Sequence, residues 1–219
     1  MNDLYIMGAG GLGKEMAWHL EMLSAESKGL HLRGFVDDDE SKWHSRLNGY
    51  PVLGRLEEVI ESDAFVLLGV GDPKQRLSAM NRIRATGAAP YTLIGPETVR
   101  ATSARLGKGT VTEIGVIIGP DVIIGDGALI NKRAIVAHDV KVGSYCNVSP
   151  FVLLSGGGGG CQLGPGCNVG AHSAVLPGVS VGKGCVIGAG AVVAQSLPPF
   201  SLAVGVPAVI KKQLPEWEI

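Results

Sequence analysis

The second half of the sequence repeats with a period of six residues, and few folds accept such a pattern. Counting from Leu106, every sixth residue is apolar except Thr112, and the register holds as far as Leu154. It resumes at Leu163 and continues to Ile187. A hexad supplies one short strand and one turn, and three hexads close a triangular coil that stacks on the next. The pattern therefore predicts a left-handed parallel β-helix.

Composition agrees with a narrow prism. A small or β-branched residue stands four places after nearly every apolar one, and we expect both to point inward. Only 5% of the residues are aromatic and 33 are glycines, as a thin interior with many turns requires. The segment from 94 to 193 has room for between five and six coils.

The first half has a different period, with apolar runs alternating with helical spacings. The expected strands are residues 4–7, 32–39, 64–72 and, less distinctly, 91–94, and the expected helices are 12–23, 56–60 and 77–83. This β-α-β-α-β order predicts a small Rossmann-like parallel sheet covered by helices. We therefore expect two domains, an α/β domain over 1–93 and a β-helix with a C-terminal tail over 94–219.

The segment GAGGLG places Gly8, Gly10 and Gly13 in the G-x-G-x-x-G spacing between a strand and a helix, and Asp37 ends the second strand. Such a loop brings backbone N–H groups close to a phosphate. A dinucleotide, a nucleotide sugar and a turn needed only for packing are all compatible with it. The small domain lacks the second half of a dinucleotide fold, which favours the nucleotide sugar and disfavours an NAD-dependent oxidoreductase.

The rest of the composition excludes several classes. The net charge of −1 gives no general attraction to nucleic acid or membranes, and no apolar run approaches the length of a membrane helix. No signal peptide is evident at the start, so we expect a cytoplasmic protein. Cys146, Cys167 and Cys185 share one hexad position without a Cys-x-x-Cys pair, so we expect reduced core thiols and no metal site.

The five histidines divide between the two halves. His19, His31 and His44 are expected at the surface or at the domain boundary. His138 and His172 fall at exposed turns of the repeat. Two histidines are too few for the three-histidine zinc site of carbonic anhydrase-type prisms, so a zinc enzyme is disfavoured.

The small glycine-rich domain, the hexad prism, the segment AHDVKVG and the ending PPFSLAVGVPAVIKK together resemble the NeuD/PglD-like sugar acyltransferases. The resemblance covers nearly the whole chain. It implies acetyl-CoA-dependent acetylation of a sugar, with a nucleotide-linked 4-amino sugar as the favoured acceptor. Sialic acid O-acetylation and a non-catalytic nucleotide-binding scaffold remain alternatives.

The resemblance also assigns roles to residues. His138 would be the general base, and Asp139 would raise its basicity. Acetyl-CoA would lie between neighbouring subunits of a homotrimer. The implied sugar-nucleotide contacts are Gly8, Gly10, Gly11, Leu12, Asp37 and Asp38, and the implied acetyl-CoA contacts are Asn147, Gly156, Gly157, Ala171 and Ala189. Leu12, Asn147 and His172 depart from the residues common in relatives, which leaves the exact sugar open.

Five consecutive glycines, Gly156 to Gly160, interrupt the hexads. The run adds three residues to one hexad, and the register then returns, so we interpret it as an insertion at a coil turn rather than a linker. Gly156 lies one coil of 18 residues after His138 and should stack beside it. We expect Gly156 and Gly157 to keep this place clear for the thioester and the other glycines to form a bulge.

Overall fold

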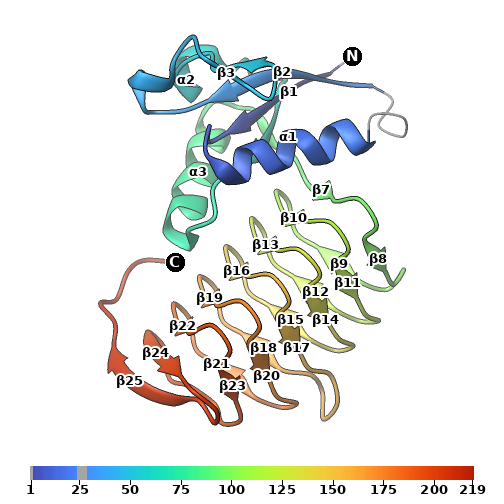
Figure 1. The fold of residues 1–219 in the computed structure, drawn as a ribbon, viewed down its shortest axis with the longest axis vertical. Helices are drawn as coiled ribbons and strands as arrows, with labels where there is room; N and C mark the ends of the chain where they lie inside the picture. The colour runs from blue at the N-terminus through green and yellow to red at the C-terminus, as the bar shows by residue number, and fades with distance from the viewer. Residues whose placement is uncertain (1, 24–28) are drawn as a thin grey trace.

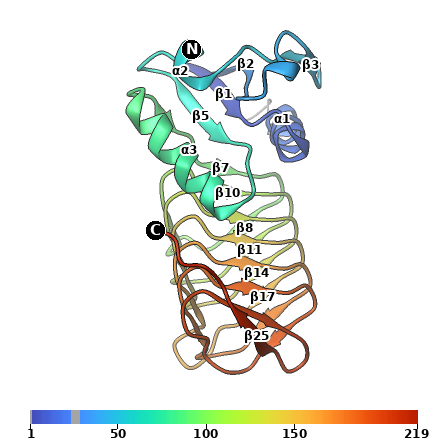
Figure 2. The ribbon, with the colours of Figure 1, turned by 90° about the vertical axis from the view of Figure 1, so that its left-hand side faces the viewer.

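A small α/β domain rests on one side of a long triangular prism (Figure 1). The computed structural model describes residues 2–23 and 29–219. The prism is the predicted left-handed β-helix, with about six coils stacked along its axis (Figure 2). None of the helices in these two ranges is long and apolar enough to cross a membrane.

The α/β domain contains a parallel sheet in the order β2-β1-β5-β6. Its strands are β1 (Asn2–Met7), β2 (Leu30–Val36), β5 (Phe65–Leu68) and β6 (Ala89–Pro90). The helices are α1 (Gly11–Leu23), α2 (Leu56–Val59) and α3 (Pro73–Ala85), and a short turn η1 (Glu40–Lys42) and hairpin β3 (Arg46–Leu47) and β4 (Tyr50–Pro51) follow β2.

Successive side chains of β1 point to opposite faces of this sheet, which explains why helices cover both faces. Leu4 and Ile6 pack into the cluster that contains the apolar side of α1. Tyr5 and Met7 pack into the cluster that contains α2 and α3. The carboxylate of Asp72 caps the N-terminus of α3 by accepting hydrogen bonds from the next turn, which begins the helix at Pro73.

One predicted strand was wrong. The segment 91–94 is not the last strand of the α/β sheet, because β6 takes that place beside β5. Leu93 and Ile94 instead form β7, which pairs with β10 as the first strand of the β-helix.

Three parallel sheets form the sides of the prism. We call docking face the sheet of β7 (Leu93–Ile94), β10 (Val111–Thr112), β13 (Leu129–Ile130), β16 (Asn147–Val148), β19 (Asn168–Val169) and β22 (Val186–Ile187), continued by β24 (Ser201–Val204) and β25 (Val209–Gln213). The apolar face is the sheet of β8 (Val99–Arg100), β11 (Ile117–Ile118), β14 (Ile135–Val136), β17 (Leu153–Leu154), β20 (Ala174–Val175) and β23 (Val192–Val193). The third face is the sheet of β9 (Arg105–Leu106), β12 (Ile123–Ile124), β15 (Lys141–Val142), β18 (Gln162–Leu163) and β21 (Ser180–Val181).

The hexad register predicted the interior. The apolar positions from Ile118 to Ile187 are buried in one continuous core. Thr112, the polar exception, is buried and accepts a hydrogen bond from the N–H of Gly95, which satisfies its hydroxyl. The predicted ladder of three cysteines lies inside, where each thiol donates to a backbone carbonyl of the following coil.

The glycine run is an insertion within one coil, as predicted. Ile123 pairs with Lys141, 18 residues on, whereas Lys141 pairs with Gln162, 21 residues on. Cys161 precedes Gln162 and is buried, so it fills the inward place that the insertion displaced. The register on all three faces continues beyond it.

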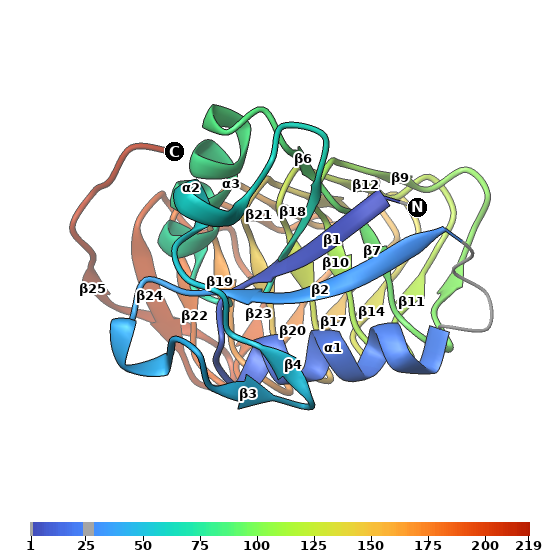
Figure 3. The same ribbon diagram turned by 90° about the horizontal axis from the view of Figure 1, so that it is seen from above.

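The α/β domain shares a core with the first three coils. Leu93, Val111 and Leu129 point outward from the docking face, yet they are buried in one cluster with Met16 and Leu20 of α1. Viewed from above, α1 and α3 lie on either side of the sheet, over the two edges of the docking face (Figure 3). In the next two coils the same outward position is polar, with Asn147 and Asn168.

A buried arginine binds the α3 side of the α/β domain to the β-helix. Arg76 of α3 has no exposed surface and donates hydrogen bonds to the carbonyl oxygens of Gly127 (2.5 Å), Val70 (2.6 Å) and Ala128 (3.2 Å). Burial lowers the pKa of this guanidinium to about 9, which still leaves it charged at neutral pH. The turn between β12 and β13 is therefore bound directly to α3.

His19 was expected at the surface or at the domain boundary, and it is not at the surface. Its side chain is fully buried on the inner side of α1, close enough to Lys132 of the β-helix for burial and charge to lower its pKa to about 4. Its place three residues after Met16 is on the apolar side of the helix, and the surface that covers it belongs to a distant part of the chain.

Candidate functional site

A cavity of about 500 Å³ opens at the carboxyl ends of β1, β2 and β5. This is the edge at which open α/β sheets bind ligands. All six residues assigned to the sugar nucleotide line it, namely Gly8, Gly10, Gly11, Leu12, Asp37 and Asp38. Lys42 and a polar side of α3 complete the wall.

The glycine loop follows the path that its sequence predicts. Gly8 has a φ of +110°, and a Cβ there would lie 2.9 Å from the carbonyl oxygen of Gly69. A Cβ on Gly13 would collide with the carbonyl oxygen of Gly8, so this glycine lets α1 lie against the end of β1. Gly10 and Gly11 have open space around them and face the cavity at the N-terminus of α1, where backbone N–H groups attract anions.

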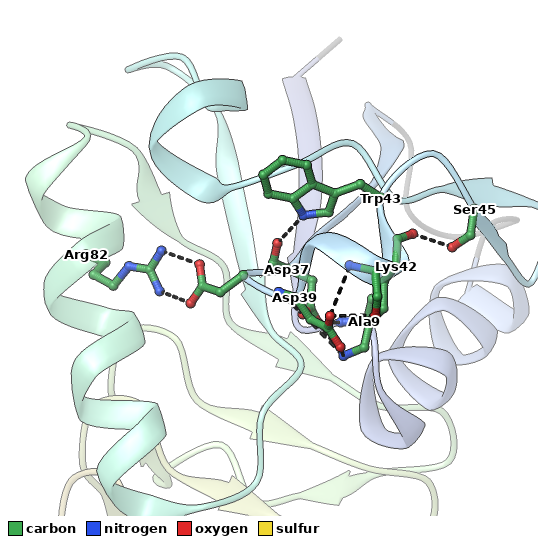
Figure 4. A network of polar contacts seen from close by, with 9 residues as sticks. Ala9, Asp37, Asp39, Lys42, Trp43, Ser45 and Arg82 are labelled. Carbon is green, nitrogen blue, oxygen red and sulfur yellow. Dashed lines mark hydrogen bonds and ion pairs between the residues drawn. The ribbon is translucent and has the colours of Figure 1, made fainter.

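Asp37 holds the loop that it faces (Figure 4). Its carboxylate accepts hydrogen bonds from the N–H of Ala9 (2.6 Å) and of Asp39 (2.9 Å). Lys42 lies 3.2 Å from both carboxylate oxygens, and the indole of Trp43 donates to the Asp37 carbonyl at 2.8 Å. Only 13% of the Asp37 side chain is exposed, so much of its hydrogen-bonding capacity stabilises the cavity wall.

Asp38 is paired with Arg82 of α3. The guanidinium donates to both oxygens of Asp38, at 2.6 and 2.8 Å, and to both oxygens of Glu57, at 2.7 and 2.9 Å. The hydrogen bonds from Arg82 hold the pKa of each carboxyl below its ordinary range and raise the pKa of Arg82. One wall of the cavity is therefore formed by charged side chains, Asp38 and Arg82, that are hydrogen-bonded to each other.

The sequence reasoning missed the contribution of α3. Gln75, Ser78, Ala79 and Arg82 line the cavity at spacings of three and four residues, which puts them on one side of the helix. Lys42, in η1, was also missed. The polar spacing within 75–82, directly after the third strand, is a signal that could have identified these residues.

His138 and Asp139 lie in the turn between β14 and β15. The Nδ1 atom of His138 lies 2.8 Å from Oδ2 of Asp139, and both side chains are about half exposed, at 54% and 48%. Asp139 has a φ of +64°, a left-handed conformation that aspartate and asparagine tolerate better than most residues. Since Nδ1 bonds the carboxylate, Nε2 is the ring nitrogen left to exchange a proton with a ligand.

Gly156 stacks directly on this histidine, as the 18-residue spacing predicted. A Cβ at position 156 would lie 2.7 Å from Nε2 of His138, closer than a Cβ comes to a non-bonded atom. Gly157 to Gly160 all have positive φ, between 55° and 89°, so the inserted segment follows a path that glycine adopts readily. The absence of a side chain at position 156 gives the imidazole of His138 room to lie over this backbone.

The other assigned acetyl-CoA contacts lie elsewhere on the same prism. Ala171 follows β19 and Ala189 stacks on it in the next coil, at the edge between the docking and apolar faces. Asn147 lies on the docking face, where its side chain bonds Asn131 (3.3 Å) and Asn168 (3.2 Å). His172, at the same edge as Ala171, stacks on the ring of Phe151 with centroids 4.9 Å apart.

The cavity and His138 lie on opposite sides of one chain. The α/β domain sits over the docking face, whereas His138 and Gly156 lie at the edge between the other two faces, which we call the far edge (Figure 1). The prism separates them. In the described residues no group of three histidine, cysteine, aspartate or glutamate side chains could hold a metal ion.

Comparison with known protein families gives a match in each of the two domains. The PglD N-terminal domain family matches residues 3–83, and the bacterial transferase hexapeptide family (six repeats) matches residues 122–156 and 158–195. Among curated proteins, the chain is 40% identical over 98 residues to the bifunctional protein GlmU of Rhodopseudomonas palustris, but it spans only 22% of that protein's length.

Two relatives match more of the chain. The chain is 26% identical over 159 residues to GDP-perosamine N-acetyltransferase of Escherichia coli O157:H7, covering 71% of each. It is 32% identical to PerB from Caulobacter crescentus, whose crystal structure contains CoA and GDP-perosamine, with a TM-score of 0.84 over 97% of this chain and 98% of that one. By this similarity over nearly its full length, the chain belongs to the NeuD/PglD-like family of hexapeptide-repeat sugar acyltransferases.

Proposed function

We propose that the protein transfers an acetyl group from acetyl-CoA to the amino group of a nucleotide-linked 4-amino sugar. The observation that carries the proposal is the His138–Asp139 pair, whose imidazole lies over Gly156, where no side chain stands. The relatives support the substrate class, since PerB binds CoA and GDP-perosamine and a second relative is named a GDP-perosamine N-acetyltransferase.

The chemistry requires one base and one oxyanion donor. The amine nitrogen attacks the thioester carbon and must lose a proton, which Nε2 of His138 would accept while Asp139 stabilises the protonated ring. The proton would then pass to the sulfur of the departing CoA. The thioester oxygen gains charge, and Gly156 and Gly157 would let it approach a backbone N–H. Structures of PerB with one histidine replaced by Asn or Ala also contain both ligands.

The cavity of the α/β domain suits the nucleotide diphosphate. Gly10, Gly11 and Leu12 offer backbone N–H groups at the start of α1, a position that favours phosphate. Lys42 supplies a nearby positive charge, and Gln75 and Ser78 supply an amide and a hydroxyl for a base or ribose. We accordingly propose that residues 1–93 bind the sugar nucleotide and residues 94–219 carry the acetyl transfer.

We propose that the working form is a homotrimer, because the two halves of the site face away from each other in one chain. A sugar nucleotide bound in the cavity over the docking face can reach a histidine on the far edge only if that histidine belongs to a neighbouring copy. The apolar face supports such packing, since its outward residues stack into an exposed apolar row: Val99, Ile117, Ile135 and Leu153. Acetyl-CoA would then lie between copies, contacting Gly156 of one and Ala171 of the other.

A cytoplasmic location fits this proposal. Acetyl-CoA and nucleotide sugars are made in the cytoplasm, and the four cysteines are free thiols, as expected in a reducing compartment.

The test is release of free CoA thiol from acetyl-CoA in the presence of GDP-, UDP- or dTDP-linked 4-amino sugars, with sialic acid as the alternative acceptor. We expect turnover with at least one 4-amino sugar and product 42 mass units heavier, as acetylation requires. His138→Ala should reduce turnover by roughly 100-fold or more. His31→Ala, a change at an exposed histidine of β2, is the matched control and should keep it.

Two outcomes would contradict the proposal. Turnover with sialic acid alone would identify an O-acetyltransferase. Tight binding of acetyl-CoA without transfer to any acceptor would support a nucleotide-binding scaffold. If His138→Ala retained wild-type turnover, the assignment of the base would be wrong even with the reaction established.

A further inference from the structure

Glu113 is the most unusual ionisable group outside the proposed site. It follows β10 in the turn toward the apolar face, and its side chain has no exposed surface. Neither carboxylate oxygen has a hydrogen-bond partner among the residues that the structure describes. Burying a carboxylate without a partner is costly, so such a group is retained only where a neighbouring charge compensates it.

That neighbour is Lys132, in the corresponding turn of the next coil. Its Nζ lies 3.7 Å from Oε2 of Glu113 and also bonds Oε1 of Glu15. Glu15 belongs to α1, so this lysine is an ionic bridge between the β-helix and the α/β domain. Two carboxyl groups thus share one ammonium group at the boundary, and burial raises the pKa of Glu113 to about 7.

The helix that receives this bridge is the one that carries the glycine loop. Glu15 lies four residues, about one turn, after Gly11, where α1 begins at the cavity. Helix α1 also meets the prism through apolar side chains, with Met16 and Leu20 in the shared core. Apolar contacts are not directional and permit a helix to slide, whereas a charged hydrogen bond fixes one position along the axis.

His19 extends the same cluster along α1. It lies one turn beyond Glu15, is fully buried, and has no hydrogen-bond partner on either ring nitrogen within the described ranges. The groups that face Glu113 and Lys132 are therefore Glu15 and His19 from α1. At neutral pH the imidazole is uncharged, so the lysine has no competing cation there.

We propose that Lys132 is a positioning residue that sets the place of α1 on the β-helix and thereby holds the glycine loop where the sugar nucleotide binds. The positioning of the loop follows from the contacts alone, and only its consequence for substrate binding rests on the proposed function. A bridge from the β-helix to the phosphate loop would also keep the two binding regions at a fixed separation.

The experiment compares amide hydrogen exchange in the unliganded protein for wild type, Lys132→Met, Lys132→Arg and Arg84→Gln. Arg84→Gln is the matched control, because it breaks an exposed ion pair between α3 and Asp126 of the β-helix at 3.0 Å. We expect exchange in residues 8–20 to be roughly 10-fold faster in Lys132→Met, as loss of a local restraint predicts. Exchange in residues 8–20 should return nearly to the wild-type rate in Lys132→Arg and should keep the wild-type rate in Arg84→Gln.

Kinetics supply the second readout. In Lys132→Met the KM for the sugar nucleotide should rise by about 10-fold while the KM for acetyl-CoA stays within about 2-fold, since the loop touches only the former. If Lys132→Met does not fold, Glu15→Gln removes the negative charge that Lys132 pairs with, from a more exposed position, and should give the same pattern.

The proposal would be overturned by unchanged exchange at residues 8–20 in Lys132→Met or Glu15→Gln. It would also be overturned if exchange rose by the same factor in the distant coil at 186–193, because the effect would then be general stability. Absence of any sugar-nucleotide turnover in the wild type would refute the proposed function, yet the exchange result would still decide the positioning role.

Discussion

The imidazole of His138 occupies the space that a side chain at position 156 would need. The two residues are one coil apart, and a Cβ on Gly156 would lie 2.7 Å from Nε2. Both residues lie two positions after the paired strands β14 and β17, and the atom in the way is the far end of a side chain, so we expect the imidazole to move.

This relationship predicts the effect of Gly156→Ala. The added methyl group should displace the ring and lower kcat/KM by roughly 100-fold, because misplacing a catalytic group by about 1 Å has such an effect. Thermal unfolding should change little. Gly49→Asn, in an exposed left-handed turn with open space around it, is the control and should keep full activity. Equal activity in the two variants would contradict the assigned contact.

Two substitutions of Asp139 should separate its chemical role beside His138 from its conformational role in the turn. Asp139→Asn keeps a residue that tolerates the observed φ of +64° but removes the negative charge beside Nδ1. We expect kcat to fall by roughly 10- to 100-fold with stability retained. Asp139→Ala should lose similar activity and, in addition, about 1 kcal/mol of stability from strain in the left-handed region. Steady-state kinetics and denaturant unfolding of both variants test this.

Glu113 should make the stability of the protein depend on pH. Its carboxyl has an ordinary pKa of 4.5 and a folded pKa of about 7, so the folded chain binds this proton more tightly than the unfolded chain. The stabilisation is complete below pH 4.5 and is lost as the pH rises through 7.

The matched variant is Glu113→Gln, whose amide does not ionise. Relative to it, the wild type should lose on the order of 3 kcal/mol of unfolding free energy between pH 4.5 and pH 8, the equivalent of the pKa interval. Urea unfolding at several pH values measures this difference. A constant difference across the range would show that Glu113 does not titrate in the cluster with Lys132 and Glu15.

Arg76 should contribute more to stability than the exposed arginines around it. Arg76→Met removes the donor to the carbonyl oxygens of Gly127 and Val70, whereas that of Ala128 keeps the N–H of Val111, so we expect a loss of about 3 kcal/mol. Arg84→Gln breaks only an exposed pair and should cost less than about 1 kcal/mol. Denaturant unfolding of the two variants would contradict this account if the losses were equal.

The features that depend on the fixed period of the repeat could be predicted from the sequence. Thr112, the cysteine ladder and the stacking of Gly156 on His138 all follow from counting coils, because each residue's neighbour lies 18 positions away, or 21 across the glycine insertion. The glycine loop was also predictable, since Gly8 and Gly13 act within one strand–turn–helix unit.

Contacts between distant segments could not be predicted in this way. Arg76 meets the turn at Gly127 about fifty residues later, and Lys132 meets Glu15 across more than one hundred. The spacing of α1 puts His19 on the apolar side with Met16 and Leu20, but it does not show that Lys132 lies beside it. The segment at Leu93 resembles a sheet strand in either domain, and only pairing with β10 decides between them.

The central claim is that the sugar-nucleotide cavity of one chain serves the histidine of another. The direct test mixes two inactive variants, His138→Ala and Gly10→Leu, after dissociation and reassembly. The Gly10 position has open space, so leucine should fill the cavity without disturbing the fold.

Acetyl transfer in the mixture decides the question. In mixed oligomers some sites combine an intact cavity with an intact histidine, and random assembly of equal amounts gives about a quarter of the sites in that form. The account predicts recovery toward a quarter of wild-type activity. No recovery, with mixed oligomers verified by mass, would show that the cavity and His138 act within one chain or not together at all.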